Sequence, residues 1–315
     1  STAQWAAMAT DDLINLTSTQ WRSLSTENLS ALAGSQWVAA DTAVLDALTT
    51  SQWASLSVLS LRALSSEQWQ SIDTAQLHAL ASAQWSAMAS DDLVSLTTGQ
   101  WALMATDDLV ALTASQWSIM VTDDLAALEA TVQWQAMASD DLAALTSIQW
   151  SQLLTDDLSG LSTEQWAYLV IDDLQSLVSS QWSSIETRDL VALTSGQWSV
   201  MQSDDLQALT TTQWAAMAPE DLNALTATPP PASAGLLNVV SRPTSQLGQW
   251  VQVATDDLIA LTSAQWQQMQ TDDLVSLSAA QWQALGTDEL VAQTSAQWQA
   301  MLTDDLLALT TNQWI

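Results

Sequence analysis

The chain has 315 residues and an unusual composition, with 35 Asp and Glu against four Lys and Arg, a net charge of −31, no Cys and 19 Trp. A chain this acidic repels phosphate backbones and anionic lipids, which argues against nucleic acid and membrane surfaces as partners. The lack of Cys excludes disulfide bonds, thiol chemistry and cysteine-ligated zinc. Hydrophobic residues make up 48% of the chain, too large a share for simple disorder. No apolar run approaches the roughly 18 residues of a membrane-spanning helix, so membrane insertion is not expected.

A sixteen-residue repeat, marked by the dipeptide Gln-Trp, runs through nearly the whole sequence. One inserted residue near Glu129 and Ala130 shifts the frame once, and residues 228–248 interrupt it. The repeat then resumes at Trp250 and continues to Trp314. A period of this kind indicates a solenoid or another repeat architecture.

Each repeat divides into two related octads, such as WALMATDD (101–108) and LVALTASQ (109–116). Large apolar residues stand at the first and fourth places of each octad, so their spacing alternates between three and five residues. A continuous α-helix would turn about 400° per average four-residue step, and its apolar stripe would drift around the helix. No single partner could cover that stripe, so we predict that the helix breaks in every octad.

Helix-start signals stand where these breaks are expected. Thr17–Gln20 and Thr113–Gln116 have the form of a capping box, which satisfies backbone donors at a helix start. In the alternate octad Thr106 is the predicted N-cap, followed by two aspartates whose charge suits a helix N-terminus. Pro219 is compatible with the first turn of a helix. Such short helices must be held by packing on their neighbours.

The predicted fold is an all-α repeat solenoid with two short antiparallel helices per sixteen residues, the Trp and Met of one octad packing on the leucines of the next. A parallel β-helix is the alternative, although its strands would need period-two alternation and β-branched residues. The repeat pattern gives one solenoid block over 1–227 and a second over 249–315. Between them, 228–248 is predicted to be a Pro-rich linker or docking segment.

The tryptophans are predicted to form the core, because one large side chain per repeat can fill the space between very short helices. The alternative is an exposed aromatic platform for sugars or pigments, or a charge-hopping chain. Trp and Leu positions are equivalent in the octad frame, which favours the core.

Eleven Asp-Asp pairs recur at the starts of the alternate octads, and close variants replace a few of them. They are predicted to stabilise helix N-termini and keep the chain soluble. The alternative is weak Ca²⁺ binding, although calcium takes six to eight oxygen ligands and one pair supplies too few. We expect salt, and Ca²⁺ more steeply if it binds, to relieve repulsion between the pairs. The calcium candidates are Asp91, Asp92, Asp107, Asp108, Asp123 and Asp124.

Nothing in the sequence indicates an enzyme. His78 is the single histidine and is predicted to lie on the surface, so there is no Ser-His-Asp set. A catalytic carboxylate pair would be unique within a cleft, whereas these pairs are repeated elements of a scaffold. No Gly-rich phosphate loop is present. No catalytic residue and no required cofactor are predicted; Ca²⁺ is the one candidate ion.

The segments TSAQWQQM (262–269) and TTNQWI (310–315) carry the T-x-x-Q-φ start of the octad form T-x-x-Q-φ-x-A-L, where φ is apolar. This pattern resembles the octad tandem-repeat regions of giant bacterial surface and secreted proteins, and the likeness covers everything except 228–248. Trp in place of the usual aliphatic residue is a departure. The resemblance implies an extracellular or cell-surface location and an adhesive or structural role.

The expected function is a structural subunit of an extracellular fibre or surface filament that assembles with copies of itself. Both ends of the sequence are in phase with the repeat and lack polar capping repeats, which favours head-to-tail stacking. The alternative is a Ca²⁺-responsive adhesin or a scaffold that binds protein or glycan. The residues predicted to take part in assembly are Trp5, Leu236, Leu237, Val239, Val240, Trp314 and Ile315.

Overall fold

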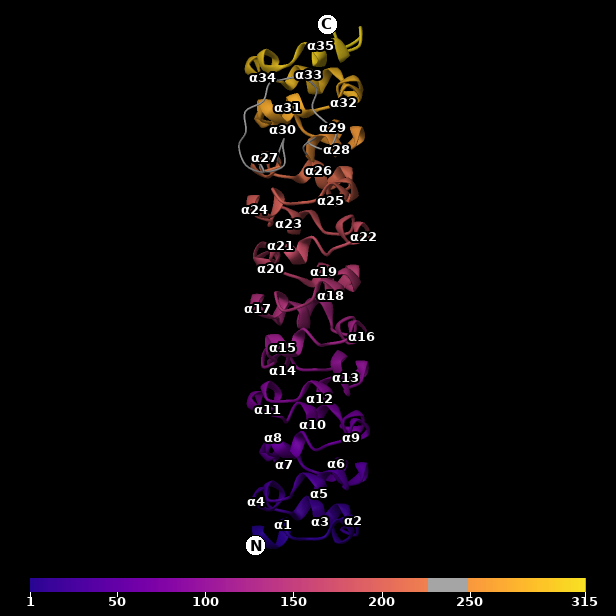
Figure 1. Cartoon of the computed structure of the whole chain (residues 1–315), viewed down its shortest axis with the longest axis vertical. Coiled ribbons are helices and arrows are strands. Elements are labelled where there is room, and N and C mark those ends of the chain that lie inside the picture. The colour runs from indigo at the N-terminus through magenta and orange to yellow at the C-terminus, as the bar shows by residue number, and fades with distance from the viewer. Residues whose placement is uncertain (226–248, 315) are drawn as a thin grey trace, which may run out of the picture. The chain divides into compact units, whose positions relative to one another are not determined.

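A computed structural model describes residues 1–225 and 249–314 of the chain. These residues form short α-helices and one π-helix, with no β-strand among them, so the all-α solenoid is confirmed and the parallel β-helix is not found. The chain forms two compact units, Ser1–Leu161 (unit 1) and Ser162–Ile315 (unit 2), whose elements are labelled in Figure 1.

The helices of unit 1 are α1 Thr2–Ala6, α2 Thr10–Ile14, α3 Ser18–Ser23, α4 Thr26–Ser30, α5 Gly34–Val38, α6 Thr42–Ala47, α7 Thr50–Ser55, α8 Val58–Leu61, α9 Ser66–Ser71, α10 Thr74–Leu77, α11 Ser82–Ser86, α12 Ser90–Val94, α13 Thr98–Ala102, α14 Thr106–Val110, α15 Ala114–Trp117, α16 Thr122–Leu125, the π-helix η1 Ala130–Trp134, α17 Ser139–Leu142, α18 Ser147–Gln152 and α19 Thr155–Gly160. Those of unit 2 are α20 Thr163–Tyr168, α21 Ile171–Leu174, α22 Ser179–Trp182, α23 Thr187–Leu190, α24 Ser195–Trp198, α25 Ser203–Ala208, α26 Thr211–Ala216, α27 Pro219–Leu222, α28 Gln249–Gln252, α29 Thr255–Ala260, α30 Ser263–Gln268, α31 Thr271–Ser276, α32 Ala279–Ala284, α33 Thr287–Ala292, α34 Ser295–Ala300 and α35 Thr303–Ala308.

Nearly all the α-helices start in the same way, with the third helical residue (N3) just before the first large apolar residue of the octad. In α15, the backbone amide of Thr113 donates to Gln116 Oε1 (2.7 Å), which completes the predicted capping box. Pro219 is the first residue of α27, as predicted. The prediction of Thr106 as an N-cap is wrong: Ala105 is the N-cap of α14 and Thr106 its first helical residue. This shift places Asp108 at N3, the position that glutamine takes in the other octads.

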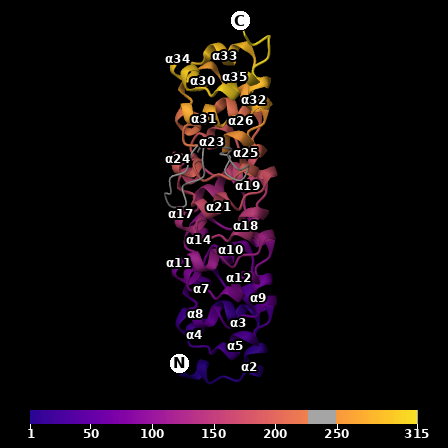
Figure 2. The same cartoon turned by 45° about the horizontal axis from the view of Figure 1, so that its top comes forward.

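Helices that touch most closely lie three positions apart in the chain, as α3 with α6, α22 with α25 and α26 with α29. Figure 2 shows one such pair of unit 1, α9 and α12, one above the other. The prediction that each octad packs mainly on the next one is therefore wrong. Each unit is instead wound as a superhelix, and its short helices are held by the turns above and below, which supplies the packing that they need.

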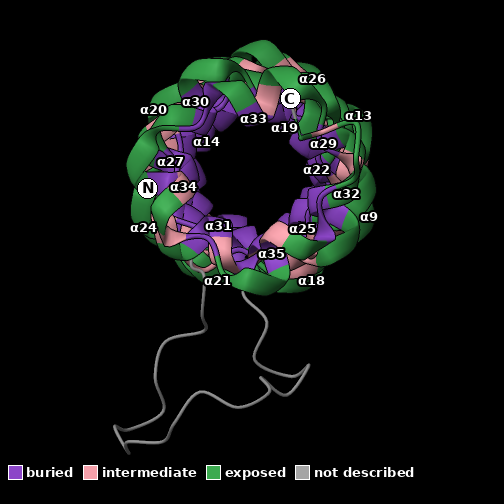
Figure 3. Ribbon diagram, turned by 90° about the horizontal axis from the view of Figure 1, so that it is seen from above, coloured by how far each residue is buried: buried purple, intermediate pink, exposed green. Residues whose placement is uncertain are grey.

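The core of each unit is its inner face, where buried residues gather while exposed residues lie on the outside (Figure 3). From Trp21 to Trp282 every tryptophan is at most 1% exposed, which confirms the predicted Trp core. From Trp37 to Trp282, the apolar residue three positions after each Trp is buried as well, whereas Leu24 after Trp21 is half-buried. The alternation of three and five in the sequence thus places both large residues of every octad on one face of the wound chain.

The inserted residue near Glu129 is accommodated by η1. Here the amide of Trp134 donates to the carbonyl of Glu129, five residues earlier (3.4 Å), in place of the usual four. The wider turn pushes the carbonyl of Ala130 against Gly160 in α19, at the place where a β-carbon would stand. Gly160 therefore has no side chain because the turn below it is widened.

The second repeat block continues the packing of the first. Within unit 2, α28, α29 and α30 pack on α25, α26 and α27. Gln265 donates to the carbonyl of Met217, 48 residues earlier (2.9 Å), whereas the corresponding bond of Gln281 to Val253 spans 28 residues. The two repeat blocks, 1–227 and 249–315, are therefore separate in the sequence pattern only. The helices on either side of the division pack on one another.

We expect deletion of residues 229–248 to leave the fold and its stability nearly unchanged. The deletion joins Thr228 to Gln249 and regenerates the segment LTATQW with a Trp-to-Trp spacing of sixteen, because Trp214 and Trp250 are 36 residues apart. Thermal unfolding followed by circular dichroism checks this. Deletion of 229–240, which leaves a Trp-to-Trp spacing of 24 residues in place of sixteen, is the control. A melting temperature lowered by the longer deletion would show that 229–248 supports the solenoid.

Candidate functional site

The most regular polar feature is the glutamine series, defined as the glutamine that precedes each Trp. In α13, Gln100 accepts a hydrogen bond from the amide of Thr97 through Oε1 (2.7 Å). Its Nε2 donates to the carbonyls of Trp69 (2.9 Å) and Ile72 (2.8 Å) in the turn below. One buried amide therefore caps its own helix and ties two turns of the superhelix together.

The same bonds recur along both units. In unit 2, Gln281 donates to the carbonyls of Trp250 (2.9 Å) and Val253 (2.8 Å), and Gln213 makes the equivalent pair with Trp182 and Ile185. These bonds span 28 and 31 residues. Because a buried amide left without partners is costly, the series fixes how the turns stack.

At the other N3 position stand the inner aspartates, each 1–8% exposed. They are Asp92, Asp108, Asp124, Asp141, Asp157, Asp173, Asp189, Asp205, Asp221, Asp257, Asp273 and Asp305. The outer residue of each pair is exposed, as Asp107 is beside Asp108. The two carboxyls of a pair therefore lie in different environments, one in the seam between turns and one in solvent.

Several inner aspartates accept a hydrogen bond from the backbone amide at their own helix start, and several face an indole. The amide of Leu154 donates to Asp157 (2.9 Å), and that of Leu302 to Asp305 (2.9 Å). Trp69 Nε1 donates to Asp92 (3.1 Å), 23 residues later. The indoles of Trp182 and Trp250 face Asp205 and Asp273 in the same way, although without the geometry of a full hydrogen bond. These backbone amides and indole N–H groups stabilise the charged form of the carboxyl groups that they contact.

Burial outweighs these bonds. It raises the pKa of Asp157, Asp205, Asp221 and Asp257 to about 6, and that of Asp273 to about 7, from an ordinary value of 3.8. The pKa of Asp92, Asp108, Asp141 and Asp305 is raised for the same reason. Desolvation disfavours the charged form, and the neighbouring outer carboxylate adds repulsion.

The few cationic or imidazole side chains that the structure describes mostly bond to carbonyls at helix ends. Arg22 donates to the carbonyl of Ala47 (3.0 Å) and Arg62 to that of Ala87 (2.6 Å), each 25 residues later. His78 is exposed, as predicted, and its Nε2 lies 2.8 Å from the carbonyl of Leu103. Arg188 pairs with Glu186 (2.9 Å).

The calcium candidates are divided by this geometry. Asp91, Asp107 and Asp123 are exposed, whereas Asp92, Asp108 and Asp124 are buried in the seam. Residues 1–225 and 249–314 bring together no group of three or more His, Cys, Asp or Glu side chains that could hold a metal ion. Calcium binding by these six residues stays a prediction. Among the described helices, none is both long and apolar enough to span a bilayer.

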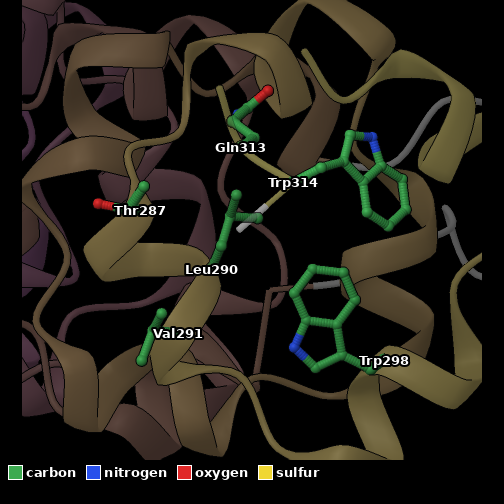
Figure 4. A pocket seen from close by; sticks show the side chains of 6 residues that line it. All are labelled: Thr287, Leu290, Val291, Trp298, Gln313 and Trp314. Carbon is green, nitrogen blue, oxygen red and sulfur yellow. The ribbon is translucent and has the colours of Figure 1, made fainter. Parts of the chain in front are cut away.

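Of the predicted assembly residues, Trp5 is partly exposed and Trp314 is 57% exposed, while Leu236, Leu237, Val239, Val240 and Ile315 lie outside the described residues. Trp314 lines an open cavity of about 260 Å³ together with Thr287, Leu290, Val291, Trp298 and Gln313 (Figure 4). Its walls carry one hydroxyl, one carboxamide and two indole N–H groups, but no titratable side chain. Trp298, unlike the core tryptophans before it, is partly exposed here.

Sequence reasoning took the glutamines for capping residues and missed their bonds between turns. A signal was present, because Gln precedes every Trp even where the N-cap is Ala33, Ala81 or Val178, which cannot complete a side-chain capping box. Such constancy indicates a second role. The burial of the inner aspartates had no comparable signal, since both residues of each pair look alike in sequence.

Comparison with known proteins agrees with this architecture. Residues 183–219 match a family described as the ALTTAQ repeat. No match was found among the curated proteins. The chain is therefore a tandem-repeat protein that is similar to the ALTTAQ repeat over 183–219.

Proposed function

We propose that the chain is a structural element of an extracellular fibre or bacterial surface filament, built from copies of itself and without catalytic activity. The observation that carries this proposal is the glutamine series, which repeats one set of bonds from turn to turn. A surface that each turn offers to the next can be extended by any further turn of the same kind. A head-to-tail contact of this type continues as a filament unless its rotation closes a ring.

The apolar cavity beside Trp314 supports the same proposal. Trp298 is partly exposed and Trp314 is exposed there, whereas the tryptophans from Trp21 to Trp282 are buried. A further turn, from this chain or from another copy, would bury them. The acidic, Cys-free composition and the resemblance to surface repeats support an extracellular place.

We expect the purified chain to form filaments of constant width in negative-stain electron microscopy, with sedimentation that depends on concentration. Val291→Glu and Trp314→Glu place charge in the cavity and should reduce assembly without changing the melting temperature. Leu59→Glu is the control, because Leu59 is 78% exposed and Val291 80%, while Leu59 does not line the cavity. A monodisperse monomer at high concentration, with no filaments in the microscope, would overturn the proposal.

A further inference from the structure

Inner aspartates of the two units differ from the rest of the polar seam in having no donor of their own. Gln76 stands at this same N3 position in α10 and donates from Nε2 to the carbonyl of Leu45 in the turn below (3.2 Å). An ionised Asp at this position can only accept. A protonated Asp regains one donor, as the O–H of its carboxylic acid.

Three inner aspartates are buried at N3 with no cation nearby in the described part of the chain: Asp157, Asp205 and Asp273. They are 3%, 6% and 3% exposed. The elements that pack closely on their helices are η1, α22, α28 and α34, and none of these four contains a charged residue. The charged groups that act on the three carboxyls are their own outer neighbours, Asp156, Asp204 and Asp272. Each inner carboxylate is thus buried beside a like charge alone.

One oxygen of this set lacks any partner. Asp273 Oδ2 is fully buried and forms no hydrogen bond, although the Trp250 indole faces its carboxyl. A buried charged oxygen without a partner is strongly disfavoured, whereas a protonated one removes the charge.

We propose that the inner aspartates are proton-binding sites and that the solenoid is a pH-sensitive device whose turns are held more tightly when these carboxyls are protonated. Protonation removes a buried charge and supplies a donor at each N3 position, as glutamine does in the alternate octads. The same gain of a donor and loss of a buried charge recur in every turn that carries an inner aspartate. Small increases in stability at the single sites therefore add along the chain.

The sign follows from the pKa values. In the unfolded chain Asp titrates near 3.8, whereas in the folded chain the pKa of Asp157 and Asp205 is about 6 and that of Asp273 about 7. The folded state therefore binds more protons between these values. The stabilisation is complete below about pH 4 and is lost as the pH rises through 6 to 7.

Potentiometric titration of the native chain and of the chain in guanidinium chloride measures the difference in bound protons directly. We expect native chain to hold several more protons at pH 5, and its melting temperature to be roughly 10 °C higher at pH 5 than at pH 8. Coincident titration curves would overturn the proposal without any variant.

Matched triple variants locate the protons. The inner triple D157N, D205N and D273N should abolish close to three of the extra protons and raise the melting temperature at pH 8. The outer triple D156N, D204N and D272N removes the same net charge from exposed neighbours and should keep the extra protons. Equal effects of the two triples would show that general charge repulsion, and not a buried site, governs the response. If the inner triple does not fold, carboxyl NMR signals of wild-type Asp157, Asp205 and Asp273 that titrate near pH 4 would contradict the proposal.

Discussion

Gln100→Glu is expected to destabilise unit 1 by about 3 kcal/mol at pH 8, the range found when a buried polar partner becomes an uncompensated charge. The variant keeps the acceptor for the amide of Thr97 but loses both donations to the carbonyls of Trp69 and Ile72. It also directs a negative charge at those carbonyl oxygens. Urea unfolding followed by Trp fluorescence measures the change as a shift of the midpoint.

Two further variants separate the causes. Gln70→Glu alters an exposed glutamine in α9. It should change the free energy of unfolding by less than about 0.5 kcal/mol. Gln100→Met fills the same space without charge or donor and should lie between the two. A Gln100→Glu protein as stable as Gln70→Glu would mean that the bonds between turns contribute nothing to the superhelix.

Gly160→Ala should destabilise unit 1 by about 3 kcal/mol, because a β-carbon there meets the backbone carbonyl of Ala130 and backbone cannot move aside as a flexible side chain can. Gly99→Ala is the control within the same unit. A β-carbon on Gly99 would meet only Thr97 Oγ1 at 3.9 Å. That variant should be neutral or slightly stabilising, because alanine is a better helix former than glycine.

Deletion of Ala130 should cancel most of the loss caused by Gly160→Ala. The deletion restores a spacing of sixteen between Trp117 and the following Trp and removes the reason for the π-turn. In a double-mutant cycle the two changes should then show a coupling energy of about 2 kcal/mol or more. Additive effects would instead show that the widened turn and Gly160 are independent.

The sequence was sufficient for the helices and the core, because both follow from short-range patterns. Apolar spacing located a break in every octad, the capping boxes at Thr17 and Thr113 were placed correctly, and the tryptophans lie in the core. The inserted residue near Glu129 was visible in the frame, although the π-turn that accommodates it was not.

Contacts between turns could not be predicted, because the pitch of the superhelix depends on the angle between successive helices. That angle is set where the chain becomes extended at residues such as Leu24 and Leu56, and an octad pattern does not encode it. Without the pitch, nothing in the sequence places Gln100 beside Trp69, or Asp92 beside the Trp69 indole. The pairing of Gly160 with Ala130 needed the same information.

The register of the seam also limits how such a gene can change. Because the bonds of the glutamine series join equivalent octads, gain or loss of sixteen codons by unequal recombination would leave every remaining bond with a partner of the same kind. The single extra residue near Glu129 is accommodated together with a glycine one turn later, at Gly160, whereas the bonds between turns resume after the segment 229–248. Chain length can therefore vary between lineages in whole repeats, while most changes of one or two codons would be removed by selection.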